Sequence, residues 1–161
     1  MRIVNTSPLI LLARIGGLEF LREPADSDVI VPEVVFQEIL AGEKFDSNVA
    51  TIRHVSTIWL RVVPNPEPAH GLDPDRLDAG ESAVLSLAIE NPGAIVILDD
   101  RAARTEAILR NIPLLGTAGV LLRAKEQGRL ESVRPTLDAV RQAGLYLTDR
   151  LYRTVLRLAG E

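Results

Sequence analysis

The sequence predicts an α/β fold of three layers, in which a mostly parallel central sheet is flanked by helices on both faces. Short apolar segments alternate along the chain with amphipathic segments of about 10–15 residues. Helical connections of that length join parallel strands through right-handed crossovers, and the resulting sheet is covered by helices on both sides. There is no internal repeat and no low-complexity tract. We therefore expect residues 1–161 to form a single domain, with a helical C-terminal extension over about residues 132–161.

Each expected element follows from a local pattern. The apolar runs predict strands at residues 2–5, 28–31, 61–63, 94–98 and 113–115. Helical periodicity and end signals predict helices at residues 7–15, 18–22, 33–41, 46–58, 79–91, 101–111, 118–127, 135–142 and 148–158. Ser7 is the predicted N-cap of the first helix, with Pro8 at its first helical position. Residues 64–77 are rich in proline and acid, and a loop of 14 residues is typical of a functional or mobile segment.

Composition narrows the class of protein. The chain contains no cysteine, which excludes disulfides and thiolate chemistry and suits a reducing cytosol, so we expect a cytoplasmic protein. No stretch approaches the roughly 20 apolar residues that span a bilayer, and the N-terminal apolar run lacks the features of a signal peptide. Aromatic residues make up 4% of the chain, so a platform of several stacking aromatics is not expected.

The charge is unevenly distributed. The net charge of −4 argues against a simple basic nucleic-acid binder. Residues 1–100 contain 7 Lys/Arg and 16 Asp/Glu, whereas residues 101–161 contain 11 Lys/Arg and 6 Asp/Glu. An acidic first part followed by a basic last third suits an enzyme that holds cations on carboxylates and phosphates on arginines. Solvated helix faces explain the same distribution.

The sharpest local feature is Asp99-Asp100, directly after the apolar run at residues 95–98. In an open parallel sheet, ligands bind beyond the carboxyl ends of the strands. Two adjacent carboxylates repel each other, and a bound cation relieves that repulsion. Helix capping is the alternative, because an Asp before Arg101 is a normal N-cap. Capping needs only one of the two, so the pattern favours a functional role for the other.

Further acids stand on the predicted helices. Glu38 shares a helix face with Val34 and Val35, which places it either inside the apolar stripe or at its solvated edge. Asp78 and Glu81 have the spacing of a capping box, and Glu81 also leads an apolar stripe. Without further context, capping is the preferred interpretation for this pair.

Polar groups follow the first and last strands. Asn5 ends the first strand, level with Asp99-Asp100 in a parallel sheet, and either binds a cation or orders the turn into Ser7-Pro8. Thr6 and Ser7 carry hydroxyls at the same edge. Thr117 follows the last strand, where it either helps to hold a phosphate at a helix N-terminus or is an ordinary N-cap. The two histidines have no partner at metal-ligand spacing, and there is no glycine-rich nucleotide-binding motif.

Taken together, these segments resemble the PIN-domain family, which includes the VapC-type toxins. The matching segments are VNTSPLILLARIG, VIVPEVVFQEIL, LDAGESAVLSLA, AIVILDDRAAR and IPLLGTAGVLLRAKEQG. They occur in the family's order over residues 1 to about 130. The likeness is greatest to a subgroup of mostly uncharacterised PIN-like proteins with the same LDAGE and LDD motifs.

The resemblance implies a metal-dependent ribonuclease with a parallel α/β sandwich. It implies Mg²⁺ or Mn²⁺ at Glu38, Glu81 and Asp100, with Asp99 as a neighbour that could substitute, and a hydroxyl near the metal at Ser7. One position departs from the family pattern, because Asn5 stands where the family usually has an Asp. The cluster loses one negative charge there, which weakens the expected cation affinity. Candidates to contact the phosphate backbone are Thr117, Arg101, Arg104, Arg123 and Lys125.

Three functions remain open from the sequence. The first is a ribonuclease that hydrolyses RNA phosphodiester bonds and is held in check by an antitoxin-like partner, with a homodimer implied by the resemblance. The second is a PIN-like RNA-binding or regulatory module whose catalysis is impaired, for which Asn5 is the main support. The third is a phospho-acceptor receiver domain. It ranks last because a receiver domain has its acid pair at the end of the first strand, whereas in this chain the pair follows a late strand and the first strand ends in Asn5.

Overall fold

The computed structural model describes residues 1–23 and 28–161, and its strands form one all-parallel sheet. The strands lie in the order β3-β2-β1-β4-β5. Their bounds are β1 (Arg2–Val4), β2 (Val29–Pro32), β3 (Leu60–Val63), β4 (Ile95–Ile97) and β5 (Leu114–Leu115). In the register of the central pair, Val4 lies opposite Ile97. The predicted parallel α/β fold is confirmed.

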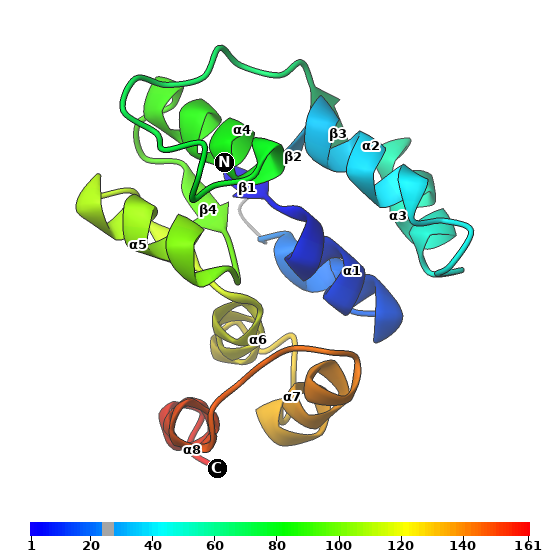
Figure 1. The fold of residues 1–161 in the computed structure, drawn as a ribbon. Coiled ribbons are helices and arrows are strands. Elements are labelled where there is room, and N and C mark those ends of the chain that lie inside the picture. Colours follow the sequence, from blue (N-terminus) through cyan, green and yellow to red (C-terminus); the bar gives the residue numbers. More distant parts are fainter. Residues whose placement is uncertain (24–27) are drawn as a thin grey trace.

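The helices surround this sheet (Figure 1). They are α1 (Thr6–Arg14), the 3₁₀ helix η1 (Leu18–Leu21), α2 (Glu33–Ala41), α3 (Val49–Ser56), α4 (Ala79–Glu90), α5 (Arg101–Leu109), α6 (Thr117–Glu126), α7 (Val133–Gln142) and α8 (Asp149–Leu158). Every helix predicted from the sequence is present, with ends that differ by at most three residues. None of the described helices is both long and apolar enough to cross a membrane.

Two predicted helix starts are corrected. The N-cap of α1 is Asn5, whose backbone is extended at φ −89° and ψ 172°, and Ser7 already lies inside the helix. Pro8 still falls in the first turn, where its missing N–H costs no hydrogen bond. The helix expected from residue 46 begins at Val49, because the Asp46 carboxylate accepts hydrogen bonds from the backbone N–H and side chain of Asn48 and forms a local turn.

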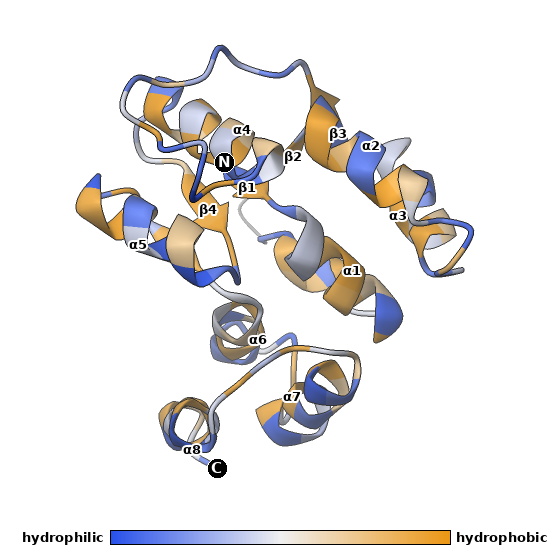
Figure 2. Cartoon of the chain, viewed as in Figure 1, coloured by the Kyte–Doolittle hydropathy of each residue, from blue (hydrophilic) through white to orange (hydrophobic). Residues whose placement is uncertain are grey.

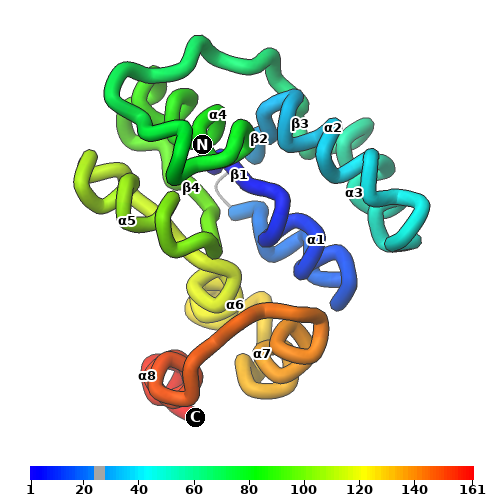
Figure 3. The backbone as a smooth tube through the Cα atoms, viewed as in Figure 1, coloured from blue at the N-terminus to red at the C-terminus, as the bar shows by residue number. Residues whose placement is uncertain are grey.

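The strand order creates a switch point between β1 and β4. The connections from β1 to β3 run in one direction across the sheet, and α4 then carries the chain back past β2 and β1 to β4. Right-handed crossovers therefore place α1 and α3 on one face and α4 and α5 on the other, in agreement with the packing of α1 on α3 and of α4 on α5 (Figure 3). Ligand sites in open α/β sheets form beyond the strand ends at such a point.

The core lies on both faces of the sheet (Figure 2). Ile3, Val4 and Ile97 are fully buried in the strands. Leu9 covers one face from α1, and Leu85 covers the other from α4, each without exposure to solvent. A sheet buried on both sides holds its strand ends rigidly, which is the condition for placing polar side chains accurately at that edge.

The C-terminal helices pack against α6. Both α7 and α8 contact α6, and α7 also contacts α1. The Glu161 carboxylate accepts hydrogen bonds from Lys125 Nζ at 2.6 Å and from the Val133 backbone N–H at 2.7 Å, and it also binds Ser132. These donors lower the pKa of Glu161 to about 2. One carboxylate thus caps the N-terminus of α7 and ties it to α6.

Candidate active site

A cavity of about 390 Å³ lies beyond the carboxyl ends of β1 and β4. Four acids from three helix segments line it: Glu38, Asp78, Glu81 and Asp100. The remaining lining residues are Asn5, Thr6, Ser7, Ile10, Leu11, Arg14, Ala143 and Gly144. The switch point of the sheet is therefore an acidic cavity, which is the site that the strand order predicts.

Asn5 is placed by the sheet itself. Its backbone N–H donates to the carbonyl of Ile97 at 3.2 Å, which fixes the end of β1 beside β4, and the residue is 7% exposed. Gly80 lies against it on α4. A Cβ at Gly80 would be 3.3 Å from Asn5 Oδ1 and 3.3 Å from Asp78 Oδ1. Glycine at position 80 therefore allows the N-terminus of α4 to approach the end of β1.

The predicted capping box at the start of α4 is confirmed. Asp78 Oδ1 accepts from the Glu81 N–H at 2.7 Å, and Glu81 Oε2 accepts from the Asp78 N–H at 3.0 Å. Both side chains also line the cavity. Capping and a role in the site are compatible, because a carboxylate has two oxygens and the cap uses one of them.

Glu81 has the most perturbed carboxyl of the cavity. It is only 7% exposed. Burial, with the neighbouring charges of Asp78 and Asp100, raises the pKa of Glu81 to about 7, against the opposing effect of the hydrogen bond from the Asp78 N–H. At neutral pH this carboxyl is therefore half protonated when no cation is bound. A divalent cation would replace that proton and relieve the repulsion among the three acids.

Asp99 and Asp100 point to different places. Asp100 is the N-cap of α5, since its Oδ1 accepts from the N–H groups of Ala102 at 2.6 Å and Ala103 at 3.0 Å, and it also lines the acidic cavity. Asp99 instead accepts from the N–H of Thr117 at 2.8 Å and from its hydroxyl at 2.6 Å. The acid that does not cap α5 is thus the one bonded to Thr117, whereas Asp100 both caps α5 and lines the acidic cavity.

The other residues proposed from the sequence also fall into two groups, those at or near the acidic cavity and those bonded elsewhere. Ser7 lines the cavity, and Arg101 is exposed next to Asp100. Arg104 is half-buried and donates to the carbonyl of Leu98 at 2.9 Å. Thr117 is fully buried and follows the N-cap Gly116, so it is not itself the cap. Arg104 and Thr117 therefore hold the segment at residues 98–99 that follows β4, and Thr117 ties this segment to the start of α6.

Glu38 reaches the rim of the cavity from α2. It is exposed, and its Oε2 accepts a hydrogen bond from the Thr6 hydroxyl at 2.6 Å. Sequence reasoning noted Thr6 but not this contact. It also missed Arg14, which donates to Asp46 at 2.8 Å and to the carbonyl of Ala143 at 2.6 Å. The latter contact joins residues 129 positions apart, which helical periodicity cannot predict.

The donor set fits a hard divalent cation. The side chains that would hold it offer carboxylate and amide oxygens only, the ligands of Mg²⁺ and Mn²⁺. Among residues 1–23 and 28–161, no three His, Asp or Glu side chains are already gathered closely enough to form a metal site. Mg²⁺ keeps several waters and needs only one or two carboxylates. The adjacent pair Glu81 and Asp100 meets that requirement.

The contact between Asp99 and Thr117 should contribute to the stability of the fold. Replacing Thr117 with valine keeps the shape but removes the hydroxyl that donates to Asp99. We expect a loss of about 1–3 kcal/mol in the free energy of unfolding, because a half-buried carboxylate loses a partner. Urea denaturation measures this. Thr105→Val, which removes an exposed hydroxyl bonded within α5, is the matched control. An equal effect of both changes would contradict the prediction.

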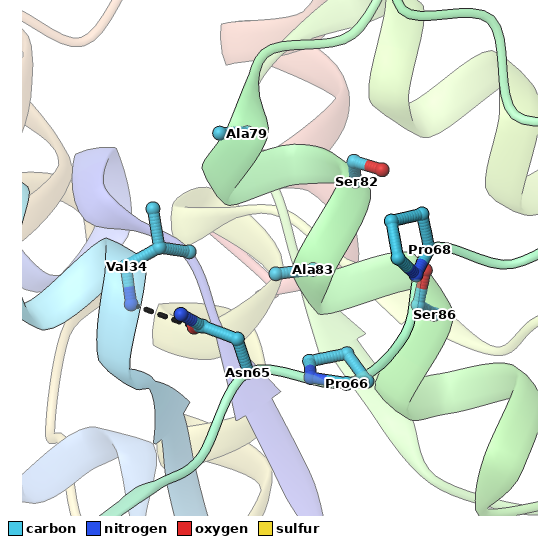
Figure 4. A pocket seen from close by; sticks show the side chains of 8 residues that line it. All are labelled: Val34, Asn65, Pro66, Pro68, Ala79, Ser82, Ala83 and Ser86. Carbon is cyan, nitrogen blue, oxygen red and sulfur yellow. Dashed lines mark hydrogen bonds between the residues drawn. The ribbon is translucent and has the colours of Figure 1, made fainter.

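A second, mostly apolar pocket of about 200 Å³ lies at the other side of the first turns of α4 (Figure 4). The loop at residues 64–77 covers it. Asn65 Oδ1 accepts from the Val34 N–H at 2.8 Å, and Ser86 Oγ accepts from the Ala69 N–H at 2.9 Å. Its lining residues are Val34, Asn65, Pro66, Pro68, Ala79, Ser82, Ala83 and Ser86. The loop is therefore anchored at two points, and the four acids of the acidic cavity do not line this pocket.

Comparison with known families agrees with this geometry. A family model described as DUF3368, a PIN domain, matches residues 1–161. The chain therefore belongs to the PIN-domain family, and its fold is of the nuclease type. PIN domains generally use divalent metal ions. No curated protein matches the chain.

Proposed function

We propose that this chain is a metal-dependent ribonuclease that hydrolyses phosphodiester bonds in RNA. The observation that carries the proposal is the acidic cavity at the β1–β4 switch point. It gathers Glu38, Glu81 and Asp100 from three separate helices, and the pKa of Glu81 is raised to about 7 by burial and by neighbouring acids. Acids clustered against one another in a cavity lower the stability of the fold, so their placement favours a functional role.

Each residue has a role in this proposal. Glu38, Glu81 and Asp100 would hold Mg²⁺ or Mn²⁺, partly through water. When bound, the cation lowers the pKa of a bound water and stabilises the charge that develops on the phosphate. Without a cation, Glu81 is about half protonated at neutral pH, so binding of the cation would release that fraction of a proton. The Ser7 hydroxyl, which lines the cavity, and Arg101, exposed next to Asp100, are the candidates to donate hydrogen bonds to a phosphate oxygen.

The test is the cleavage of a mixed pool of single-stranded RNA. Wild-type protein, shown to be folded and free of partners, is incubated with Mn²⁺ or with EDTA, and the products are separated on a denaturing gel. Cleavage with Mn²⁺ that disappears with EDTA supports the proposal. Absence of cleavage under both conditions would overturn it.

One feature favours a second function, an RNA-binding or regulatory module with impaired catalysis. Asn5 lies in the cavity where the PIN-domain pattern has an acid, so the site has one fewer negative charge than that pattern. A cluster with less negative charge attracts a divalent cation more weakly.

Restoring the acid should therefore strengthen the site. We expect Asn5→Asp to increase Mn²⁺ affinity by at least about tenfold, because a carboxylate at this position adds a direct charge partner for the cation. Isothermal titration with Mn²⁺ measures the change. Asn111→Asp, at an exposed position after α5, makes the same change in net charge and should leave the affinity unaltered. If only Asn5→Asp cleaves RNA, the native chain is the impaired module.

The resemblance to toxins adds two further proposals, a homodimer and a partner protein that keeps the nuclease inactive. Both stay predictions from family membership. Light scattering on the purified chain determines its oligomeric state. Co-expression with the product of a neighbouring gene tests for a stable complex, and loss of RNA cleavage in that complex would identify the partner as an inhibitor.

A further inference from the structure

We propose that the outer face of α8 is a binding surface for the phosphate backbone of single-stranded RNA, an inference that rests on the ribonuclease function and extends it. Arg150, Arg153 and Arg157, together with Thr154, line a shallow depression of about 330 Å³ on this helix. Three guanidinium groups are donors that match phosphate oxygens, whereas the Thr154 hydroxyl donates to the carbonyl of Arg150 at 2.9 Å.

The arginine row has no ion-pair partner in the described part of the chain, and Arg153 Nε donates only to the carbonyl of Asp149, at 3.3 Å. The ion pairs among residues 1–23 and 28–161 use other basic side chains, and none includes Arg150, Arg153 or Arg157. Residues three and four apart on a helix are neighbours, and like charges at that spacing repel. Packing does not require these charges either, because α8 is buried through Val155 and Leu156 on its opposite face. Phosphates would supply the missing negative charge.

A path connects this row to the active site. Ala143 and Gly144 form part of the wall of the acidic cavity, and α8 begins at Asp149. The short segment between them passes from α7 across α6 to α8 (Figure 1). Tyr146 lies in this segment and is 87% exposed. Its ring offers a face on which one base can stack, and Tyr146 stands between the wall of the cavity and the arginine row in the order of the chain.

The lining of the depression favours RNA over a protein. Protein interfaces are built around buried apolar anchors with charged residues at the rim. The residues that line the depression are polar, three of the four being arginines. The chain as a whole carries a charge of −4, so attraction of a polyanion must depend on a local positive surface such as this one.

RNA binding without turnover tests the proposal. A fluorescein-labelled 20-nucleotide oligouridylate is titrated with full-length protein in EDTA and followed by fluorescence anisotropy. For the triple variant Arg150→Gln, Arg153→Gln, Arg157→Gln we expect at least about tenfold weaker binding. The slope of log Kd against log salt should fall by about 2, since each lost phosphate contact contributes about 0.7. Tyr146→Ala should weaken binding at least about fivefold, and Tyr146→Phe should not.

The matched control is the triple variant Arg53→Gln, Arg61→Gln, Arg76→Gln, which removes the same charge from exposed sites on other parts of the surface. Unchanged binding by the α8 variant, or equal weakening by both triple variants, would overturn the proposal. So would displacement of the RNA by poly-glutamate at equal charge concentration, because the row would then serve an acidic protein.

Failure of the ribonuclease proposal and failure of the α8 proposal give different experimental results. With Mn²⁺, the α8 variant should cleave a dinucleotide as fast as the wild type but show a higher KM for the 20-nucleotide RNA. Equal KM values for the long RNA would count against the α8 surface alone. Absence of cleavage of both substrates by the wild type would overturn the nuclease, whereas the binding measured in EDTA decides the role of α8 by itself.

Discussion

Replacing Asp100 with asparagine should reduce metal-dependent RNA cleavage at least about a hundredfold, whereas the same replacement at Asp99 should leave the turnover of the folded protein within about threefold. The two residues are adjacent in sequence and the two changes are chemically identical. They differ in what the side chain contacts: Asp100 lines the acidic cavity beside Glu81, and Asp99 is bonded to Thr117.

The two variants should also differ in stability. Asparagine keeps the oxygen with which Asp100 caps α5, and it is among the best N-cap residues, so Asp100→Asn should change the free energy of unfolding by less than about 1 kcal/mol. Asp99→Asn weakens two hydrogen bonds to a fully buried threonine and should cost about 1–3 kcal/mol. Initial cleavage rates with Mn²⁺ and urea denaturation measure the two effects. Loss of activity in Asp99→Asn, with Asp100→Asn active, would reverse the assignment.

Replacing Glu81 with glutamine should stabilise the metal-free protein above pH 7. The pKa of Glu81 rises from 4.5 to about 7 on folding, so the native state keeps a proton that the unfolded chain releases. The contribution of Glu81 to stability is therefore fully present below pH 4.5 and is lost as the pH rises to about 7. The loss is at most about 3 kcal/mol, reduced by solvent in the open cavity.

Glutamine has no such proton to lose, and its carbonyl oxygen can still accept the capping hydrogen bond from Asp78. The melting temperatures of wild type and Glu81→Gln, measured in EDTA, should converge near pH 4.5 and diverge up to about pH 7. Glu90→Gln, at the exposed end of the same helix, is the control and should show no such divergence. If the difference in melting temperature between wild type and Glu81→Gln stays constant with pH, the raised pKa of Glu81 is refuted.

Adding Mn²⁺ completes this experiment. At pH 8 the wild type should gain about 2.7 kcal/mol of stability at a metal concentration of 100 times Kd, because the ligand binds only the native state. The gain should shrink below pH 7, where the cation competes with the proton on Glu81. Glu81→Gln should show little gain at either pH, since the cation loses one of its charged ligands.

The fold could be predicted from the sequence because its signals are local. The apolar run before Asp99 and the proline at position 8 each report on a few neighbouring residues. The grouping of Glu38, Glu81 and Asp100 was likewise predictable once they were matched to the PIN-domain pattern. The different contacts of Asp99 and Asp100 could not be predicted, because they depend on the position of Thr117 after β5.

Two kinds of information were absent from the sequence patterns. An acid that caps a helix and an acid that lines a cavity look the same in the sequence. Only the three-dimensional contacts show that Asp78, Glu81 and Asp100 take part in helix caps and also line the acidic cavity. The wall at Ala143 and Gly144 depends on contacts across more than a hundred residues. Small residues in a connecting segment carry no periodic signal that would point to a site.

Because Ala143 and Gly144 line the acidic cavity, truncation of the C-terminal helices would alter that cavity. The last three helices are clamped together by Glu161, and the segment between α7 and α8 is fastened to α1 through Arg14 and the carbonyl of Ala143. Removal of residues 132–161 would open one side of the acidic cavity as well as shorten the chain. The C-terminal helices are therefore an integral part of the acidic cavity, and a molecule that displaced them would change the cavity without touching any of its carboxylates.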